Sequence, residues 1–161
     1  LDALCRDLTY EMQTGLGNRH HIQLVSQLSS RPTYLDKKLF RQIFTNLLSN
    51  AIKYSQPSTN IEIELLNPAN EILLKVKDQG IGILSVDLPH VFESFHRGSN
   101  IDTIPGNGLG LSIVQQCVDL MGGSISLESQ PGSGSTFTVK LPFTYTAPKV
   151  DADRVFWTGD V

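Results

Sequence analysis

Cysteine, positive charge and long apolar runs are all scarce in this chain of 161 residues. The two cysteines, Cys5 and Cys117, are too few for a disulfide framework or a cysteine-rich metal site, and both stand in helix-like sequence where a small buried side chain is usual. Thirteen basic against 16 acidic residues give a net charge of −3, which offers no positive field to nucleic acid or an anionic membrane surface. No stretch reaches the roughly 18 apolar residues of a membrane-spanning helix. We therefore expect contact with neither nucleic acid nor membrane, and a cytoplasmic location.

The rest of the composition is that of one globular domain, since 40% of the residues are hydrophobic and 18% are charged. The chain begins at Leu1 in mid-pattern, without a methionine or a leader, which we expect of a piece of a longer protein. Apolar periodicity ends near Phe143. We predict a domain over residues 1–143, followed by a C-terminal tail over residues 144–161.

Apolar spacing divides the domain into helices and strands. Repeats of three and four residues predict helices over residues 1–14, 36–55 and 109–121. Alternation predicts strands over residues 21–27, 60–66, 71–77, 124–130 and 135–141. Asp36 can cap the second helix, with Leu35 and Phe40 placed to pack as a hydrophobic staple. Because helices and strand pairs mix without regular alternation, the pattern favours an α+β sandwich with helices on one face of a mixed, mostly antiparallel sheet.

Three polar residues gather on one side of the second predicted helix. At about 100° per residue, Asn46, Asn50 and Lys53 fall within roughly 60° of one another, beside the apolar stripe. Asparagine favours helices poorly, so two of them one turn apart need a reason. The amide oxygens could bind Mg²⁺ beside substrate phosphates, with the ammonium neutralising phosphate charge, or the amides could simply hydrogen-bond to neighbouring loops. The spacing alone favours neither interpretation.

A stretch with little periodicity, residues 78–110, begins with Asp-Gln-Gly-Ile-Gly directly after a predicted strand. A loop of this length in a compact domain is usually functional or mobile. The Asp78 carboxylate could accept a hydrogen bond from the exocyclic amine of adenine and would reject the oxygen of guanine, while Gly80 and Gly82 admit a flat ligand. A plain turn with a capping acid explains the same residues.

The stretch ends in Gly-Asn-Gly-Leu-Gly-Leu-Ser, residues 106–112, which enters the third predicted helix. Unpaired N–H groups at a helix start form an anion site together with the positive end of the helix dipole, and glycines let phosphates approach. The segment lacks the Gly-Lys-Ser ending of a P-loop and the preceding strand of a Rossmann fingerprint. The pattern indicates a phosphate cradle, and a flexible hinge is the alternative.

These motifs, with Phe-Glu-Ser-Phe-His-Arg at residues 92–97 and Gly-Ser-Gly-Ser-Thr-Phe at residues 132–137, resemble in order the N, G1, F, G2 and G3 boxes of sensor histidine kinases. The resemblance is to the catalytic, ATP-binding domain of that family and covers about residues 1–143. It implies the Bergerat fold, a two-layer sandwich shared with gyrase, Hsp90 and MutL ATPases. It also implies ATP and Mg²⁺ as cofactors and transfer of the γ-phosphoryl group to histidine in two-component signal transduction.

The resemblance also assigns roles by position. At the phosphates it implies that Asn50 binds Mg²⁺, that Asn46 and Lys53 contact phosphate, and that Arg97 is a candidate catalytic contact to the γ-phosphate. The implied ATP-binding positions are Asn46, Asn50, Lys53, Tyr54, Asp78, Gly80, Gly82, Phe95, Arg97, Gly108, Leu109, Gly110, Leu111 and Thr136.

At the base, the resemblance implies that Asp78 reads the adenine amine, that Tyr54 lies beside the ring and that Thr136 closes the pocket. Phe95 falls at the start of a lid that runs to about Gly110. The histidines are not among the motif positions. We expect His96 at the lid surface, and His20, His21 and His90 in solvent.

One departure from the hydrolytic relatives concerns Asn46, because those relatives have a glutamate there that activates water. An amide cannot act as a general base, so we expect slow hydrolysis of ATP by water and transfer of the phosphoryl group to another nucleophile. In sensor kinases this is a histidine, followed by an acid, on a helical dimerisation domain, and none of the four histidines here precedes an acid. We therefore expect a monomeric fragment that cannot phosphorylate itself, with the dimerisation domain of its parent protein and a response regulator as partners.

Three other functions remain compatible with the sequence. A hydrolytic ATPase shares the implied fold but needs the missing carboxylate. A serine kinase of the same superfamily would differ in what it phosphorylates. A non-enzymatic docking module would bind nucleotide without turnover.

Overall fold

The computed structural model describes residues 1–15, 20–29, 33–100, 104–143 and 154–157, with backbone alone at 33 and 154–157. The helices are α1 (Asp2–Gly15), α2 (Lys37–Tyr54) and α3 (Gly110–Leu120), with a short 3₁₀ helix at Leu88–His90. The strands are β1 (His21–Gln27), β2 (Thr33–Asp36), β3 (Asn60–Leu66), β4 (Glu71–Lys77), β5 (Ser124–Gln130), β6 (Gly134–Pro142) and β7 (Arg154–Trp157). The predicted bounds of β1, β3, β4 and β5 are confirmed, and each predicted helix lies within one residue of its observed bounds.

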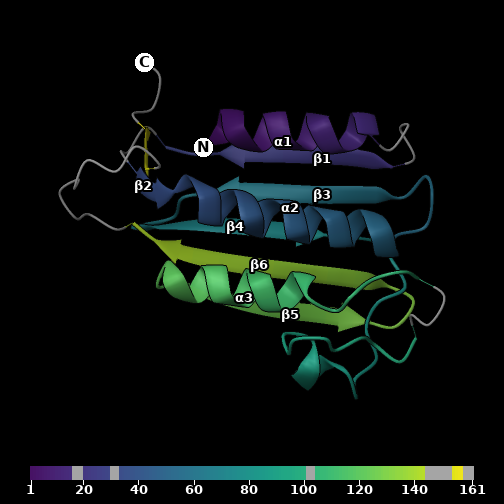
Figure 1. Cartoon of the computed structure of the whole chain (residues 1–161). Coiled ribbons are helices and arrows are strands. Elements are labelled where there is room, and N and C mark those ends of the chain that lie inside the picture. The colour runs from purple at the N-terminus through teal and green to yellow at the C-terminus, as the bar shows by residue number, and fades with distance from the viewer. Residues whose placement is uncertain (16–19, 30–32, 101–103, 144–153, 158–161) are drawn as a thin grey trace.

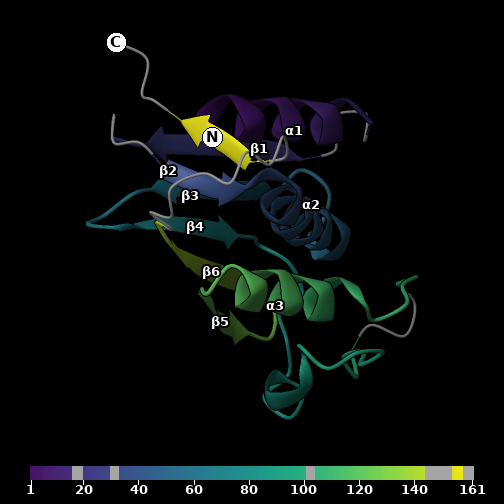
Figure 2. The same ribbon diagram turned by 60° about the vertical axis from the view of Figure 1, so that its left-hand side comes forward.

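The main sheet has five strands in the order β1-β3-β4-β6-β5. β1 pairs with β3 in parallel, and the other pairs are antiparallel. All three α-helices lie against one face of this sheet, as Figure 1 and the turned view in Figure 2 show. The predicted α+β sandwich with a mixed, mostly antiparallel sheet is therefore confirmed. Among the described residues, no helix is long and apolar enough to cross a bilayer.

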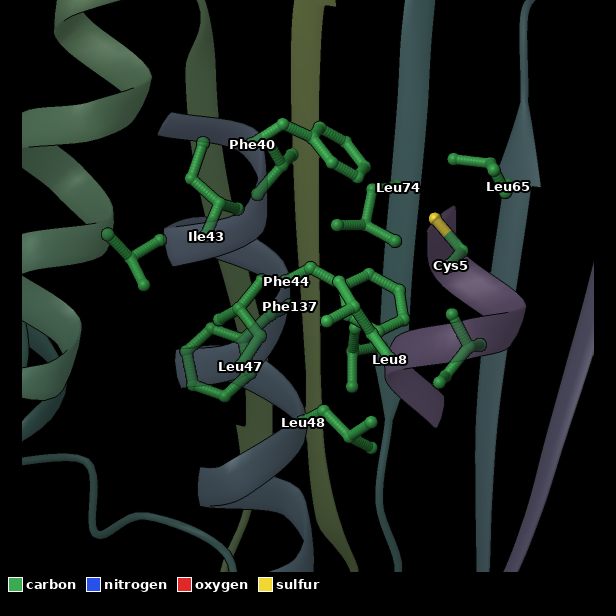
Figure 3. Packing of buried hydrophobic residues seen from close by; sticks show 14 of the residues in the cluster. Cys5, Leu8, Phe40, Ile43, Phe44, Leu47, Leu48, Leu65, Leu74 and Phe137 are labelled. Carbon is green, nitrogen blue, oxygen red and sulfur yellow. The ribbon is translucent and has the colours of Figure 1, made fainter. Parts of the chain in front are cut away.

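The core fills the space between the helices and the sheet, because the helices and strands both bury one face (Figure 3). The labelled side chains in this cluster are Cys5, Leu8, Phe40, Ile43, Phe44, Leu47, Leu48, Leu65, Leu74 and Phe137. Both cysteines are free and buried, as predicted. Burial raises the pKa of the Cys5 thiol to about 12 and also raises the pKa of the Cys117 thiol, so neither forms a thiolate readily.

Helix α2 begins where the sequence predicts. The Asp36 carboxylate accepts hydrogen bonds from the Lys38 and Leu39 N–H groups at 2.9 and 3.0 Å. Leu35 and Phe40 are both buried in the core on either side of this cap. The helix ends at Tyr54, and the N–H of the next residue, Ser55, donates to the Ala51 carbonyl at 3.2 Å. This start and end place the polar side of α2 next to the loop that follows β4.

Removal of the α2 cap provides a stability test. We expect Asp36→Ala to lower the free energy of unfolding by about 1 kcal/mol, because two N–H groups of the first turn lose their acceptor. Urea unfolding followed by circular dichroism measures the change. Asp36→Asn keeps a capping oxygen and should cost much less; equal losses in both variants would contradict the capping role.

Two features of the fold were not predicted. β2 and β7 form a separate antiparallel pair, and β7 lies in the tail where no periodicity was found. Each has four residues, too few for an alternating pattern to stand out, and the pairing joins distant parts of the chain. His20 was expected in solvent and is buried, with 8% of its surface exposed, because it stands just before β1. His21 and His90 are exposed, as predicted.

Candidate functional site

A cavity of about 340 Å³ lies between α2, the start of α3, the loop after β4 and the edge of β6. Figure 1 shows the C-terminal end of α2 and the N-terminal end of α3 at the same end of the sheet, next to that loop. The predicted site residues that line the cavity are Asn46, Asn50, Lys53, Tyr54, Asp78, Gly82, Arg97, Gly108, Leu109, Gly110 and Leu111. Segments far apart in the sequence thus meet around one space.

The amides of α2 face the start of α3. A Cβ atom placed on Gly110 would stand 3.3 Å from Asn46 Oδ1 and 3.7 Å from Asn50 Oδ1, so the backbone of α3 comes directly against both side chains. Asn46 donates through Nδ2 to the Gln42 carbonyl of its own helix at 2.8 Å. The Asn50 side chain makes no hydrogen bond to the described residues. The interpretation in which these amides only tie down neighbouring loops therefore has no support in the described part of the chain.

The start of α3 has the features of an anion site. Its N-cap residue, Leu109, makes no side-chain cap, and the first helical hydrogen bond runs from the Ile113 N–H to the Leu109 carbonyl at 3.0 Å. N–H groups ahead of that bond lack helical acceptors and carry the positive end of the dipole. Gly108 has φ +71°, and a Cβ there would collide with the Phe95 and His96 backbone, so glycine is required at this turn.

Two cations also line the cavity. Lys53 Nζ stands 4.8 Å from the centre of the Tyr54 ring, a cation–π distance, and lies so close to Gly106 that a Cβ there would collide with it. Arg97 lines the cavity and donates to the Ile104 carbonyl. Amide side chains, an uncapped helix start and two cations thus line one cavity, a combination that suits phosphate groups with a hard cation.

Asp78 also lines the cavity, with 6% of its surface exposed. Its Oδ1 accepts hydrogen bonds from the Gly80 N–H at 2.8 Å and from the Ser135 N–H at 3.3 Å. Burial raises the pKa of this carboxyl, and the two N–H donors offset part of that rise. Both bonds use Oδ1, so Oδ2 is free of described donors and can accept from a ligand.

The glycines after Asp78 allow close contacts within the protein itself. A Cβ on Gly80 would lie 2.5 Å from the Tyr54 carbonyl oxygen and 2.7 Å from Asp78 Oδ1, and Gly80 does not line the cavity. Gly82 lines it with φ +65°, and a Cβ there would collide with the Gln130 carbonyl. These glycines let the loop come against α2 and β5, which holds Asp78 in place; the sequence had suggested that they admit a ligand.

The segment after β4 differs from expectation at two aromatic residues. Phe95 does not line the cavity: its side chain is 74% exposed, its φ is +66°, and its N–H donates to the Gly108 carbonyl at 3.0 Å. His96, expected at the lid surface, does line the cavity, and its Nε2 stands 3.6 Å from the buried Asp87 carboxylate. That prediction was wrong because the positive φ at residue 95 turns the next side chain inward.

The sequence did not identify the other residues that line the cavity, of which some are apolar and some polar. The lining residues that it missed are Ser49, Ile81, Ile83, Val91, His96, Gly98, Asn100, Asn107, Ile113, Ser135 and Phe137. Thr136 does not line the cavity, whereas its neighbours Ser135 and Phe137 do, because successive side chains of β6 point to opposite faces. This period of two was available in the sequence and could have found Ser135.

The arrangement defines a class of protein. A cavity lined by a buried carboxylate, amide side chains, cations, apolar residues and an open helix start fits a purine nucleotide. The chain belongs to the histidine kinase-, DNA gyrase B- and HSP90-like ATPase family, which it matches over residues 35–145.

Several proteins to which the chain is similar are sensor proteins or histidine kinases. The chain is 36% identical over 141 residues to the heme sensor protein HssS of Staphylococcus haemolyticus, which covers 88% of this chain and 30% of HssS. The structure of the mycobacterial sensor histidine kinase MprB aligns with a TM-score of 0.72 at 25% identity, over 88% of this chain and 93% of that one. The catalytic domain of histidine kinase ThkA has the same fold, with a TM-score of 0.76 at 22% identity and the same coverage. The chain thus spans less than a third of HssS.

Proposed function

We propose that this chain is the ATP-binding catalytic part of a sensor histidine kinase, which passes the γ-phosphoryl group of ATP to a histidine on a separate dimerisation domain of the same parent protein. The observation that carries the proposal is the position of Gly110 against Asn46 and Asn50, which brings an uncapped helix start and two amide oxygens to one point. Downstream, a response regulator would receive the phosphoryl group.

The residues around the cavity divide the work of holding ATP. Asp78 would accept a hydrogen bond from the adenine amine through Oδ2, with Tyr54 beside the ring. Lys53 would neutralise phosphate charge, and the Gly110 and Leu111 N–H groups would donate to phosphate oxygens, whereas the Leu109 N–H already donates to Asn107 Oδ1. Arg97 would turn from the Ile104 carbonyl toward the γ-phosphate. Gly80, Phe95 and Thr136 are outside the cavity lining and receive no contact role.

A metal ion fits this site only together with a ligand. The described residues contain no group of three or more His, Cys, Asp or Glu side chains that could hold a metal. Mg²⁺ commonly keeps waters and takes one or two protein oxygens beside substrate phosphates, and Asn50 can supply such an oxygen. The ion would neutralise phosphate charge, and Asn50 would fix its place relative to α3.

The chemistry of Asn46 favours transfer over hydrolysis. Its amide has no basic lone pair with which to take a proton from water, and its Nδ2 is already bound to Gln42. Phosphoryl transfer needs positioning and charge neutralisation more than proton abstraction. This favours a kinase over a hydrolytic ATPase; steady-state phosphate release by the purified chain would favour the ATPase.

We expect the chain alone to bind ATP without becoming phosphorylated. No histidine here precedes an acid, and His96, which lines the cavity, faces the Asp87 carboxylate. The measurement is incubation with γ-labelled ATP, followed by gel electrophoresis at neutral and acid pH. Addition of a histidine-containing dimerisation domain from the parent protein should produce an acid-labile label on that domain only.

Asp78→Asn is the control for this labelling, because its weaker binding of ATP should lower the transfer to the added domain when ATP is below saturation. Stable label on the chain itself, retained by a His96→Gln variant, would contradict the proposal and favour a serine kinase. Binding without any transfer to the added domain would favour the docking module.

A further inference from the structure

The hydroxyl of Ser129, near the end of β5, stands at a junction of three segments. It accepts a hydrogen bond from the Ile83 N–H in the loop after β4 at 2.9 Å. It donates to the Gly134 carbonyl at the start of β6 at 2.9 Å. Its third partner is the Ser135 hydroxyl, also at 2.9 Å. Ser129 itself does not line the cavity, but Ile83 and Ser135 do.

The positions of the protons follow from the partners. A carbonyl oxygen can only accept, so the single proton of the Ser129 hydroxyl points at Gly134. The Ile83 N–H can only donate, so it takes one of the two lone pairs on Ser129 Oγ. In the pair of hydroxyls, Ser135 must therefore be the donor and Ser129 the acceptor. Ser129 thereby uses its full capacity of one donor and two acceptor sites.

This assignment determines what Ser135 can offer to a ligand. Because its proton is directed to Ser129, its Oγ presents only lone pairs to the cavity. The Ser135 backbone N–H donates to Asp78 Oδ1 at 3.3 Å, so the hydroxyl lies on the residue next to the carboxylate. The part of the cavity proposed to hold the base therefore has two hydrogen-bond acceptors on neighbouring segments, Asp78 Oδ2 and Ser135 Oγ. Ser135 is buried, with 9% of its surface exposed.

We propose that Ser129 is a positioning residue that sets base specificity: by binding the Ser135 proton, it makes the site accept purines with an amino group at position six and reject those with an oxygen there. The inference rests on the proposed function, since it concerns the base end of the same nucleotide site. A free Ser135 hydroxyl could rotate and donate to a six-oxo group. The pair Ser129 and Ser135 prevents that rotation and adds to the discrimination made by Asp78.

The test compares the dissociation constants of ATP and inosine triphosphate for the full chain by calorimetry. Wild type should prefer ATP. Ser129→Ala should lower this preference roughly fivefold or more, by weakening ATP and sparing or improving inosine triphosphate. Ser129→Thr keeps a hydroxyl and should preserve the wild-type preference. Ser126→Ala removes an exposed hydroxyl from the same strand and is the matched control.

A second set of variants separates positioning from general support of the fold. Ser129→Cys has a side chain of similar size with a weak hydrogen-bonding group, and it replaces the alanine variant if that one unfolds. In a Ser135→Ala background, Ser129→Ala should change the preference no further, because Ser129 acts through the Ser135 hydroxyl.

An unchanged preference in Ser129→Ala, or an equal loss of affinity for both nucleotides, overturns the inference while the proposed ATP site stands. A further fall in the Ser135→Ala background also overturns it, because Ser129 would then act by another route. If wild type shows no preference for ATP, the proposed base recognition at Asp78 fails, and the role of Ser129 fails with it.

Discussion

Asn50→Ala is expected to remove the Mg²⁺ dependence of ATP binding and to weaken nucleotide-dependent metal binding about 100-fold or more. The Asn50 side chain lies against the start of α3 and has no described hydrogen-bond partner. The variant therefore removes the proposed metal ligand without breaking a hydrogen bond within the protein. Calorimetric titration of ATP, with and without Mg²⁺, measures the effect. Wild type should bind more tightly with the ion, and the variant should bind equally in both conditions.

The matched control for this variant is Gln42→Ala, an exposed position two turns earlier on α2 whose backbone carbonyl still accepts from Asn46. It should retain the wild-type response to Mg²⁺. A normal Mg²⁺ response in Asn50→Ala would show that other groups bind the ion and would contradict the proposed role of Asn50 as a metal ligand.

Asp78→Asn is expected to weaken ATP binding by about 1–3 kcal/mol, or roughly 5- to 150-fold in the dissociation constant. An ionised acceptor is replaced by a neutral amide, while the amide oxygen can still accept from Gly80 and Ser135, so the loop should keep its structure. Asp7→Asn, on the exposed side of α1, is the control and should bind as wild type does. Equal affinity in all three proteins would exclude Asp78 from the adenine site.

The same carboxyl predicts a pH dependence of defined sign. Burial raises the pKa of Asp78 in the folded chain, so acidification protonates it at a higher pH than an ordinary aspartate. ATP affinity should fall as the pH drops through that raised pKa, and Asp78→Asn should lack this fall. The free energy of unfolding has the opposite pH dependence. Ionisation of the buried Asp78 destabilises the folded chain, so the free energy of unfolding should fall as the pH rises through the raised pKa of Asp78. Unfolding experiments on Asp78→Asn should lack this fall.

Local pattern was enough to predict most of the fold and the phosphate end of the site. The rotation of Asn46, Asn50 and Lys53 about one helix is a property of the sequence alone, and these residues do line one cavity. The start of α3 was predicted from its glycines. The contact between the start of α3 and the two amides is a tertiary contact. It was expected from the resemblance to a known family, and the spacing of residues alone did not predict it.

The features that the sequence pattern did not predict depend on contacts between segments that are distant in the chain. His96 faces the cavity because Phe95 has a positive φ, which no rule for aromatic residues predicts. Gly80 seemed to admit a ligand, but it allows close contact with the Tyr54 carbonyl, which lies on another element. β2 and β7 were missed because each has only four residues and the two strands pair between distant parts of the chain.

The most direct test is a crystal structure of this chain with Mg²⁺ and a non-hydrolysable ATP analogue. We predict the metal about 2.1 Å from the Asn50 amide oxygen and from phosphate oxygens, with those phosphates against the N–H groups that begin α3 and the adenine amine at Asp78. A nucleotide bound elsewhere, or phosphates that reach only one of the two regions, would contradict the account.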